Sequence, residues 1–381
     1  MSSATIPYLL VLLSLLPLEA FSQERHDPAE VWRVGLPDSL RSRVNQAVIL
    51  PGTSSVVVTS PQGLWRIDDA GEVAPIAWFE RLKAAEDLGL STTLSADGSR
   101  VGVLKHDHHA LAGFDLFDLQ GDAVATVPDT QTFHYRIAPG GGSFVGIDAG
   151  GEHVQVNASR FVYHLFDQAG RRIADIESLA PRPFDSAYSA DGEVLVLNNR
   201  DGLSAYGAND GGLRWKAAMA ARTFAAANAA TGVVAATDAQ DRKRVAILRN
   251  GEQVRDYRLD GNSRNVAVSP NGQFVLAADA TTAHMLTPGS ERALWQIGLP
   301  EAGYTIRSIA VSDAGLALIG AQHENLKSGT VIVADQSGGV LYRQDLPLQR
   351  SNAWIPTVQL GVEGESALLR SLEELILIDL R

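Results

Sequence analysis

The sequence predicts an all-β chain that folds as a propeller of eight four-stranded blades, with seven blades as the alternative. Three observations predict this fold. Turn glycines recur eight times along the 381 residues, and short runs of branched apolar residues lie between them. One further run stands before the first complete repeat. Seven blades stay open because the last unit is short and the third carries an insertion.

The turn glycines set the length of the repeat. Most of them follow a short polar turn, as in Leu-Ser-Ala-Asp-Gly98 and Val-Ser-Pro-Asn-Gly272. The steps between successive glycines are 46, 44, 50, 40, 40, 43 and 49 residues. A period of about 45 residues is typical of a four-stranded propeller blade. The eight glycines are Gly52, Gly98, Gly142, Gly192, Gly232, Gly272, Gly315 and Gly364.

Short β-type runs fill each period. The turn glycine is followed by a run rich in branched residues, such as Glu193–Leu197 or Phe274–Ala277. A third run ends at a second turn glycine, as in Leu64–Gly71, and a fourth run such as Val340–Arg343 closes the unit. We expect inner strands to be buried on both faces and outer strands to alternate. The periodicity predicts one helix, Phe79–Leu90, in a connection between blades.

The run Val31–Pro37, which stands before the first repeat, predicts how the ring closes. Val31–Pro37 reads Val-Trp-Arg-Val-Gly-Leu-Pro and reappears, nearly unchanged, as Leu294–Pro300. The last unit, Val358–Arg381, stops one such segment short. We therefore expect the first strand to complete the last blade, which leaves no free sheet edge.

The first 22 residues have the features of a signal peptide. Ile6–Leu18 is a nearly unbroken apolar stretch of 13 residues, too short to span a bilayer, and small residues follow at Ala20 and Ser22. We predict that residues 1–22 are removed on export and that residues 23–381 form a single propeller domain. The expected location is the periplasm or the extracellular space.

Composition excludes several classes of function. The chain has no cysteine, so it has no disulfide, no thiolate metal ligand and no cysteine for lipid attachment. Its net charge of −12 disfavours nonspecific binding to nucleic acid or to anionic membranes. We expect a monomer without a membrane span, and a protein partner or a small anionic ligand.

Three fourth-strand segments carry a resemblance to a known family. Gly211–Trp215, Gly289–Trp295 and Gly338–Tyr342 resemble the glycine-to-tryptophan signature of PQQ-like propeller repeats of bacteria. The Ser-Ala-Asp-Gly and Ser-Pro-Asn-Gly turns are similar to those of WD-type propellers. The resemblance implies either a quinoprotein dehydrogenase or a cofactor-free propeller such as the bacterial outer-membrane assembly scaffold. Without cysteine the chain lacks the vicinal cysteine pair of the dehydrogenases, which favours the cofactor-free branch.

Arginines at the entrance to the innermost strands are candidate ligand-binding residues. Each stands eight to fourteen residues before the first turn glycine of its repeat. In an acidic protein, guanidinium groups around one channel mouth would suit carboxylates or phosphates. The alternative is that they pair with neighbouring Asp and Glu residues. The six are Arg43, Arg182, Arg222, Arg264, Arg307 and Arg350.

A cluster of histidines is the candidate metal site. His106, His108 and His109 fall in a predicted loop, where neutral imidazoles at near-alternate positions can bind zinc or copper. Further ligands across the same face could come from Asp107, from His134, or from the Glu152–His153 and His323–Glu324 pairs. The alternative is a solvated polar loop, because no known ligand spacing is met.

Two functions follow from these observations. The first is an exported, noncatalytic propeller that acts as a protein-interaction scaffold or binds a small ligand, with no cofactor. The second is a propeller enzyme with a loop metal site, either a lactonase-like hydrolase or a quinone-dependent oxidoreductase. The sequence contains no complete catalytic set, which favours the first.

Overall fold

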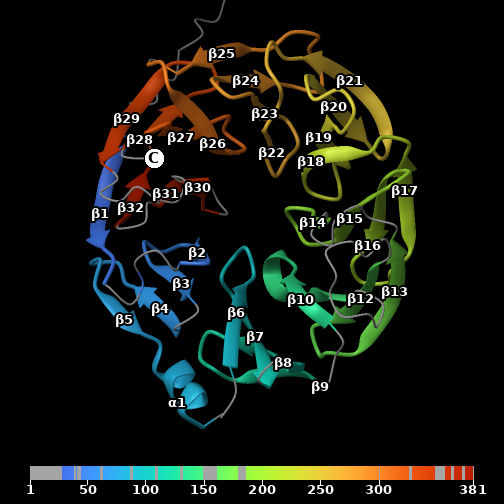
Figure 1. Ribbon diagram of the computed structural model, residues 1–381, viewed down its shortest axis with the longest axis vertical. Coiled ribbons are helices and arrows are strands. Elements are labelled where there is room, and N and C mark those ends of the chain that lie inside the picture. Colours follow the sequence, from blue (N-terminus) through green and yellow to red (C-terminus); the bar gives the residue numbers. More distant parts are fainter. Residues whose placement is uncertain are drawn as a thin grey trace, which may run out of the picture.

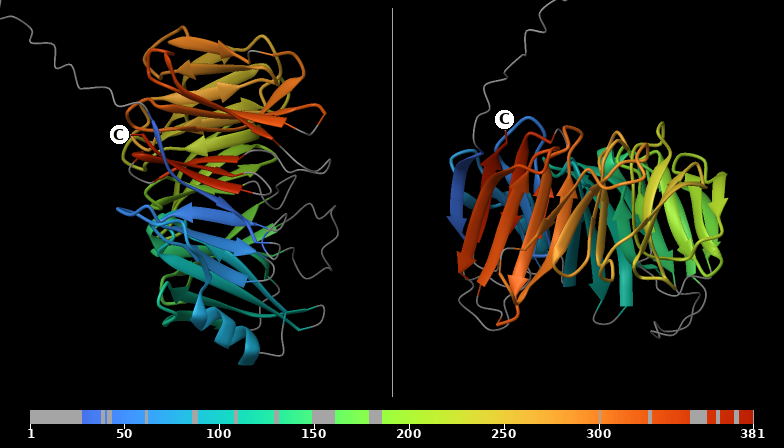
Figure 2. Two further views of the ribbon diagram at one scale, coloured as in Figure 1. Left: turned by 90° about the vertical axis from the view of Figure 1, so that its left-hand side faces the viewer. Right: turned by 90° about the horizontal axis from the view of Figure 1, so that it is seen from above.

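The computed structural model describes residues 28–37, 40, 44–60, 63–85, 89–107, 110–128, 132–148, 161–178, 186–299, 301–325, 328–347, 357–361, 364–370 and 374–380. These residues form eight four-stranded antiparallel sheets arranged in a ring. Figure 1 shows one strand of each sheet nearest the centre, namely β2, β6, β10, β14, β18, β22, β26 and β30, and the strand at the other end of the sheet at the rim. Figure 2 shows the ring from its edge, as a flat body with α1 on its periphery. The eight-bladed propeller predicted from the repeat length is confirmed.

The first four blades follow each other along the chain. Blade 1 is β2 (Gln46–Ile49), β3 (Val56–Ser60), β4 (Gly63–Ile67) and β5 (Val73–Pro75). Blade 2 is β6 (Gly89–Leu94), β7 (Arg100–Asp107), β8 (Ala110–Asp118) and β9 (Ala123–Pro128). Blade 3 is β10 (Thr132–Ile137), β11 (Ser143–Asp148), β12 (Phe161–Asp167) and β13 (Arg172–Ser178). Blade 4 is β14 (Ser186–Tyr188), β15 (Val194–Asn199), β16 (Gly202–Gly207) and β17 (Leu213–Ala217).

The next three blades repeat this order, and the last one departs from it. Blade 5 is β18 (Ala221–Ala226), β19 (Val233–Asp238), β20 (Arg244–Arg249) and β21 (Glu252–Arg258). Blade 6 is β22 (Asn265–Val268), β23 (Val275–Ala278), β24 (Thr282–Leu286) and β25 (Trp295–Gly298). Blade 7 is β26 (Tyr304–Val311), β27 (Ala317–His323), β28 (Ser328–Ala334) and β29 (Val340–Pro347). Blade 8 joins β30 (Thr357–Leu360), β31 (Ser366–Arg370) and β32 (Glu374–Asp379) to β1 (Ala29–Gly35).

The predicted ring closure is therefore present. β1 pairs antiparallel with β32, with Val34 opposite Leu375, so the first strand completes the last blade. Arg33 and Glu374 form an ion pair of 3.2 Å across this seam. The resembling segment near residue 295 forms β25, which is the outer strand of blade 6 just as β1 is of blade 8. The sequence repeat thus marks equivalent positions in the ring.

Burial follows the expected pattern in the second strands and at the rim, but several innermost strands are less buried than predicted, because they border the centre of the ring: all four residues of β22 are only partly buried. Every residue of β3 is buried, whereas buried and exposed residues alternate over the second half of β1. The apolar side chains form eight clusters, each shared by two neighbouring blades. The cluster between blades 8 and 1, for example, packs Trp32 and Leu377 against Ile49 and Val58. Stability is thus distributed around the ring, since each blade buries its faces against two others.

The turn glycines adopt the left-handed conformation that the repeat requires, with one exception. Gly98 has φ of 68° and Gly272 has φ of 69°, a region in which only glycine is free of strain. In the third repeat the sequence predicts this role for Gly142, but Gly142 has φ of −68°. Gly140 and Gly141 take positive φ instead, because a short 3-10 turn, η1 (Pro139–Gly141), occupies this connection.

The predicted helix is present, but its bounds differ. α1 spans Ala77–Ala85 instead of Phe79–Leu90. Its Phe79 is buried in the cluster between blades 1 and 2. The predicted end was wrong because β6 already begins at Gly89, which pairs with His106 of β7. Glycine weakens a helix, and the sheet hydrogen bonds compete for its backbone. Within the described residues no helix has both the length and the apolar character needed to cross a membrane.

Candidate functional site

Three of the six predicted arginines meet in one cavity. Arg222, Arg264 and Arg307 line a cavity of about 400 Å³ together with Arg242, which sequence reasoning missed. Arg222 is in β18 and Arg307 is in β26, the innermost strands of blades 5 and 7. Arg264 comes one residue before β22, the innermost strand of blade 6. Arg43, Arg182 and Arg350 lie outside the described residues. We call the cavity lined by Arg222, Arg242, Arg264 and Arg307 the arginine pocket.

Two β-bulges direct arginines into this pocket. Arg222 is the extra residue at a register shift in β18, and Arg307 is the extra residue at a register shift in β26. A bulge bends the strand and turns a side chain away from the regular alternation. The side-chain amide of Asn265 donates a hydrogen bond to the Arg307 carbonyl (3.1 Å) and so ties β22 to the bulge of β26. The bulges of blades 5 and 7 thus stand on either side of blade 6, whose Arg264 precedes the regularly paired β22.

Backbone hydrogen bonds hold the other two arginines. Arg242 lies in the loop between β19 and β20, and its carbonyl accepts a hydrogen bond from the Ser263 amide (2.7 Å). The amide of Arg264 donates to the Ala278 carbonyl (2.8 Å). The buried hydroxyls of Ser263 and Thr237 are 2.9 Å apart and link blade 5 to the segment that enters blade 6. The positions of all four arginine backbones are thus set by the fold.

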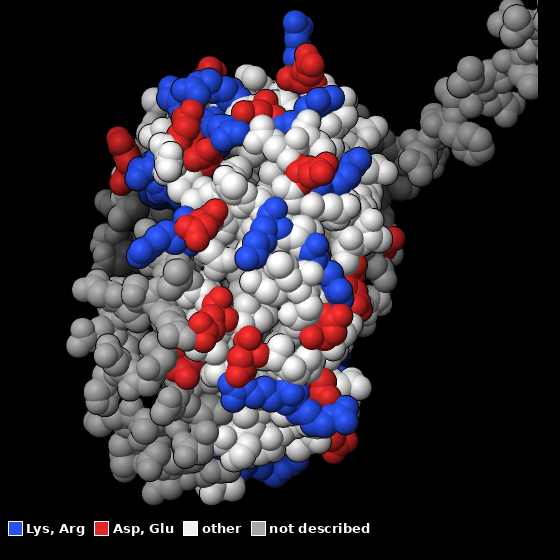
Figure 3. Space-filling view, turned by 90° about the vertical axis from the view of Figure 1, so that its right-hand side faces the viewer, with Lys and Arg blue, Asp and Glu red and all other residues white. Residues whose placement is uncertain are grey.

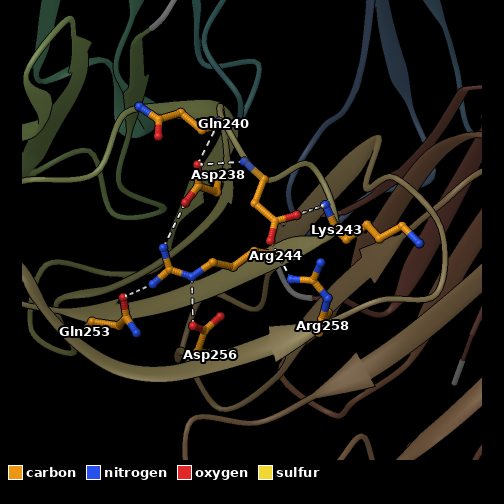
Figure 4. Close-up of polar contacts among 8 residues, drawn as sticks. Asp238, Gln240, Lys243, Arg244, Gln253, Asp256 and Arg258 are labelled. Carbon is orange, nitrogen blue, oxygen red and sulfur yellow. Dashed lines mark hydrogen bonds and ion pairs between the residues drawn. The ribbon is translucent and has the colours of Figure 1, made fainter.

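The carboxylates of Asp238 and Asp241, which shortly precede Arg242 in the chain, are paired with other arginines (Figure 4). Arg244 donates to Asp238 and to Asp256, each at 2.8 Å, and Arg258 donates to Asp241. Burial by itself would raise the pKa of Asp238. Its carboxylate accepts hydrogen bonds from two backbone amides and from the Arg244 guanidinium, and together these lower the pKa below its ordinary value. Asp238 is therefore ionised at neutral pH, and Arg244 neutralises it.

The pocket consequently carries uncompensated positive charge. Within the part of the chain that the structure describes, none of its four guanidinium groups has a carboxylate within 4 Å, and no Asp or Glu lines the cavity. The Nε atom of Arg307 is buried and has no hydrogen-bond partner among those residues. Arg222, Arg242 and Arg264 are exposed and Arg307 is half-buried, so water solvates these charges where an anion is not bound.

The histidine cluster is only partly described. His106 is in β7, not in the loop that the sequence predicts, because β7 continues to Asp107 and β8 begins at Ala110. Its Nε2 atom lies 2.9 Å from the Ser91 hydroxyl. His108 and His109 lie outside the described residues. Among the residues described, no group of three or more His, Asp and Glu side chains could hold a metal ion. Metal binding by this cluster stays a prediction.

A second cavity lies along the innermost strands of blades 1 to 4. Its volume is about 680 Å³, and β2, β6, β10 and β14 line it. Figure 1 places β2, β6 and β10 across the ring axis from β18, β22 and β26 of the arginine pocket, and β14 beside β18. His106 and His134 both line it, together with Arg136. Burial and the charge of Arg136 lower the pKa of His134 to about 4. We call this the channel cavity.

Sequence reasoning missed Arg136 and Arg242 for different reasons. Arg136 stands six residues before Gly142, closer than the eight to fourteen residues that the predicted arginines share, and Arg242 is in the loop between β19 and β20. A signal for Arg136 was available, because a charged residue in a strand predicted to line the channel is unusual. Arg242 carried no such signal, since it reaches the pocket only through the packing of two blades.

The side of the ring that Figure 3 shows carries charges of both signs among its described residues. Figure 3 faces the rim of the ring near β13, β17 and β21, and Lys and Arg are interspersed there with Asp and Glu. Several of these groups form exposed pairs, such as Arg214 with Asp210 at 2.7 Å. Exposed pairs of this kind contribute about 0–1 kcal/mol each. The arginine pocket differs because all the charged side chains that line it are positive.

The fold defines the class of this protein as a β-propeller, and comparisons with solved structures agree. The C-terminal WD40 domain of Sif2 superposes with a TM-score of 0.59 at 12% identity, covering 93% of this chain and 98% of that domain. BamB from Moraxella catarrhalis gives 0.57 at 12% identity, with 92% and 99% covered. A chain of a mitotic checkpoint complex gives 0.51 at 12% identity, with 99% of each chain covered. No protein-family model matches the sequence, and no curated protein matches it.

Proposed function

We propose that this chain is an exported, noncatalytic interaction scaffold whose arginine pocket anchors an acidic segment of a partner protein. One observation carries the proposal: four guanidinium groups from adjacent blades line one cavity without a carboxylate among the described residues. Charge-assisted hydrogen bonds to carboxylates are the strongest that such a pocket can form. The similarity in fold to WD40 domains and to BamB supports a scaffold, because rigid propellers present loops on a fixed frame.

Binding of an acidic peptide tests this function. A hexaglutamate peptide should bind to the full chain, and a hexaglutamine peptide should not. The double substitution Arg264→Ala/Arg307→Ala should weaken hexaglutamate binding at least tenfold, since hydrogen bonds to charged groups contribute about 1.5–3 kcal/mol each. Its melting temperature should stay close to that of the wild type, because partly exposed charges contribute about 0–1 kcal/mol. Titration calorimetry at low salt measures the affinities.

The control removes two arginines that lie outside the pocket. Arg249 and Arg292 are exposed, and neither side chain has an ion-pair partner among the described residues. Arg249→Ala/Arg292→Ala lowers the net charge by the same amount and should leave binding unchanged. Equal losses in both double variants would show general electrostatic attraction and contradict a specific pocket. Citrate and inorganic phosphate, run in parallel, show whether a small anion suffices.

Export is the second element of the proposal, and it rests on residues 1–22. An apolar stretch followed by small residues is the pattern that signal peptidase reads. Mass spectrometry of the protein recovered from its native host should show a chain that begins at residue 23, outside the cytoplasm. A cytoplasmic chain that retains residues 1–22 would contradict it.

A further inference from the structure

The channel cavity combines an apolar wall with one charged group. Leu94, Leu104 and Ile137 line it and are buried. Its polar lining consists of neutral side chains, chiefly hydroxyls, amides and imidazoles, apart from Arg136. No Asp or Glu of the described residues lines it. A cavity of about 680 Å³ is within the size range of small-molecule sites.

Arg136 has almost no compensation for its charge. Its Nη1 atom donates a hydrogen bond to the Ser186 carbonyl, which is its one hydrogen-bond acceptor among the described residues. None of the carboxylates described lies within 4 Å of it. Burial lowers the pKa of Arg136, and the phenols of Tyr163 and Tyr188 offset part of that shift. An arginine stays protonated in proteins, so a partly buried cation with five N–H donors faces the cavity here with one protein acceptor among the described residues.

Two buried hydroxyl groups in the lining also lack partners. The Thr92 Oγ1 and Tyr188 Oη atoms make no hydrogen bond of normal geometry with any residue that the structure describes. Burial raises the pKa of Tyr188, and the nearby Ser143 hydroxyl and Arg136 only partly oppose this shift. Tyr188 is therefore a neutral hydrogen-bond donor near pH 7. A buried donor without an acceptor is costly, and a bound acceptor would remove that cost.

We propose that the channel cavity binds a small monocarboxylic acid with an apolar body, whose carboxylate pairs with Arg136. The apolar body would pack against Leu94, Leu104 and Ile137. A single cation favours a monoanion, because a second negative charge would be buried without a partner. This site is separate from the arginine pocket, and it does not depend on the scaffold function.

Benzoate and hexanoate are suitable probes, since one has an aromatic and the other an aliphatic body. Both should bind to the full chain in titration calorimetry and raise its melting temperature. Their neutral analogues benzamide and hexanamide should bind at least tenfold more weakly, because they cannot neutralise Arg136. Inorganic phosphate should not compete with benzoate. If neither carboxylate binds, or if the amides bind equally well, the proposal is wrong.

Substitutions locate the site. Arg136→Met should abolish benzoate binding. Arg136→Lys should weaken it, because an ammonium group lacks the planar guanidinium donors that bind both oxygens of a carboxylate. Arg255→Met is the matched control: Arg255 also donates to a single backbone carbonyl, that of Val254 at 3.2 Å, but it lies on the outer strand β21. It should bind benzoate as the wild type does. Arg264→Ala/Arg307→Ala should also bind normally, so that failure of one site is distinguished from failure of the other.

The ligand-free variants provide a second readout. A buried, uncompensated cation destabilises a folded protein, so Arg136→Met should melt at the same temperature as the wild type or higher. A clear fall in melting temperature would show that Arg136 has a structural role. Retention of benzoate binding by Arg136→Met would overturn the proposal even if the wild type binds.

Discussion

Deletion of β1 is expected to destabilise the whole ring, not only the blade that loses it. The deletion removes Trp32 and Val34 from the cluster between blades 8 and 1 and leaves β32 with an unpaired edge. Burial of a large apolar side chain contributes about 1.5–3 kcal/mol, and the sheet hydrogen bonds of β1 are lost in addition. We expect the free energy of unfolding to fall by about 5 kcal/mol or more, a large part of the total for a typical domain. Urea unfolding followed by circular dichroism measures it.

Single substitutions in the same strand provide the matched control. Val34 is 9% exposed and faces the core, whereas Val31 is 41% exposed. Val34→Ala should therefore lower the unfolding midpoint clearly, and Val31→Ala should leave it nearly unchanged. An unchanged midpoint after deletion of β1 would contradict ring closure by this strand.

Acidification is expected to destabilise the protein through His134 well before the carboxylates are protonated. The pKa of His134 is about 4 in the folded protein, below its ordinary value of 6.5. Between these two values the unfolded chain binds a proton that the folded chain does not. Stability therefore falls as the pH drops from about 6.5 towards 4, and the loss is roughly 2–3 kcal/mol for a shift of this size. Urea unfolding at pH 7.5, 6.5, 5.5 and 4.5 measures this slope.

A substitution separates His134 from the other titrating groups. His134→Gln cannot bind the proton in either state, so its stability should change less between pH 6.5 and 4.5 than that of the wild type. His284→Gln is a second comparison, because burial also lowers the pKa of His284 and the carboxylates of Asp279 and Asp260 only partly oppose this shift. It should flatten the profile in the same direction. Identical losses in the wild type and in His134→Gln would contradict the assignment.

Most of the fold could be predicted because local chemistry repeats with the blade. A glycine is required wherever the chain turns with positive φ, as at Gly52 and Gly192, and such positions are visible in the sequence. The second turn is equally local: the side chain of Asp68 accepts hydrogen bonds from the amides of Ala70 and Glu72. The predicted bounds were wrong where pairing between strands decided the outcome. The helix α1 ends at Ala85, because Gly89 already pairs with β7 as the first residue of β6.

The candidate site was predictable only in part. The shared position of Arg222, Arg264 and Arg307 before their turn glycines is a property of the repeat, and it indicated a common location. Their convergence on one cavity depends on the angle between blades and on two bulges, which the repeat does not encode. Arg242 joins them from another loop, so its sequence position carried no information about the pocket.

The sequence by itself indicated the blade length and the strand that closes the ring, and it favoured eight blades over seven. It could do so because turns and alternating strands depend on residues a few positions apart. Only the tertiary structure decided which charged groups lack partners. Whether a guanidinium is neutralised depends on neighbours from other strands: Arg244 of β20 meets Asp238 of β19 and Asp256 of β21, whereas Arg136 faces a cavity without a carboxylate among the described residues. Those unpaired charges carry the proposals for function.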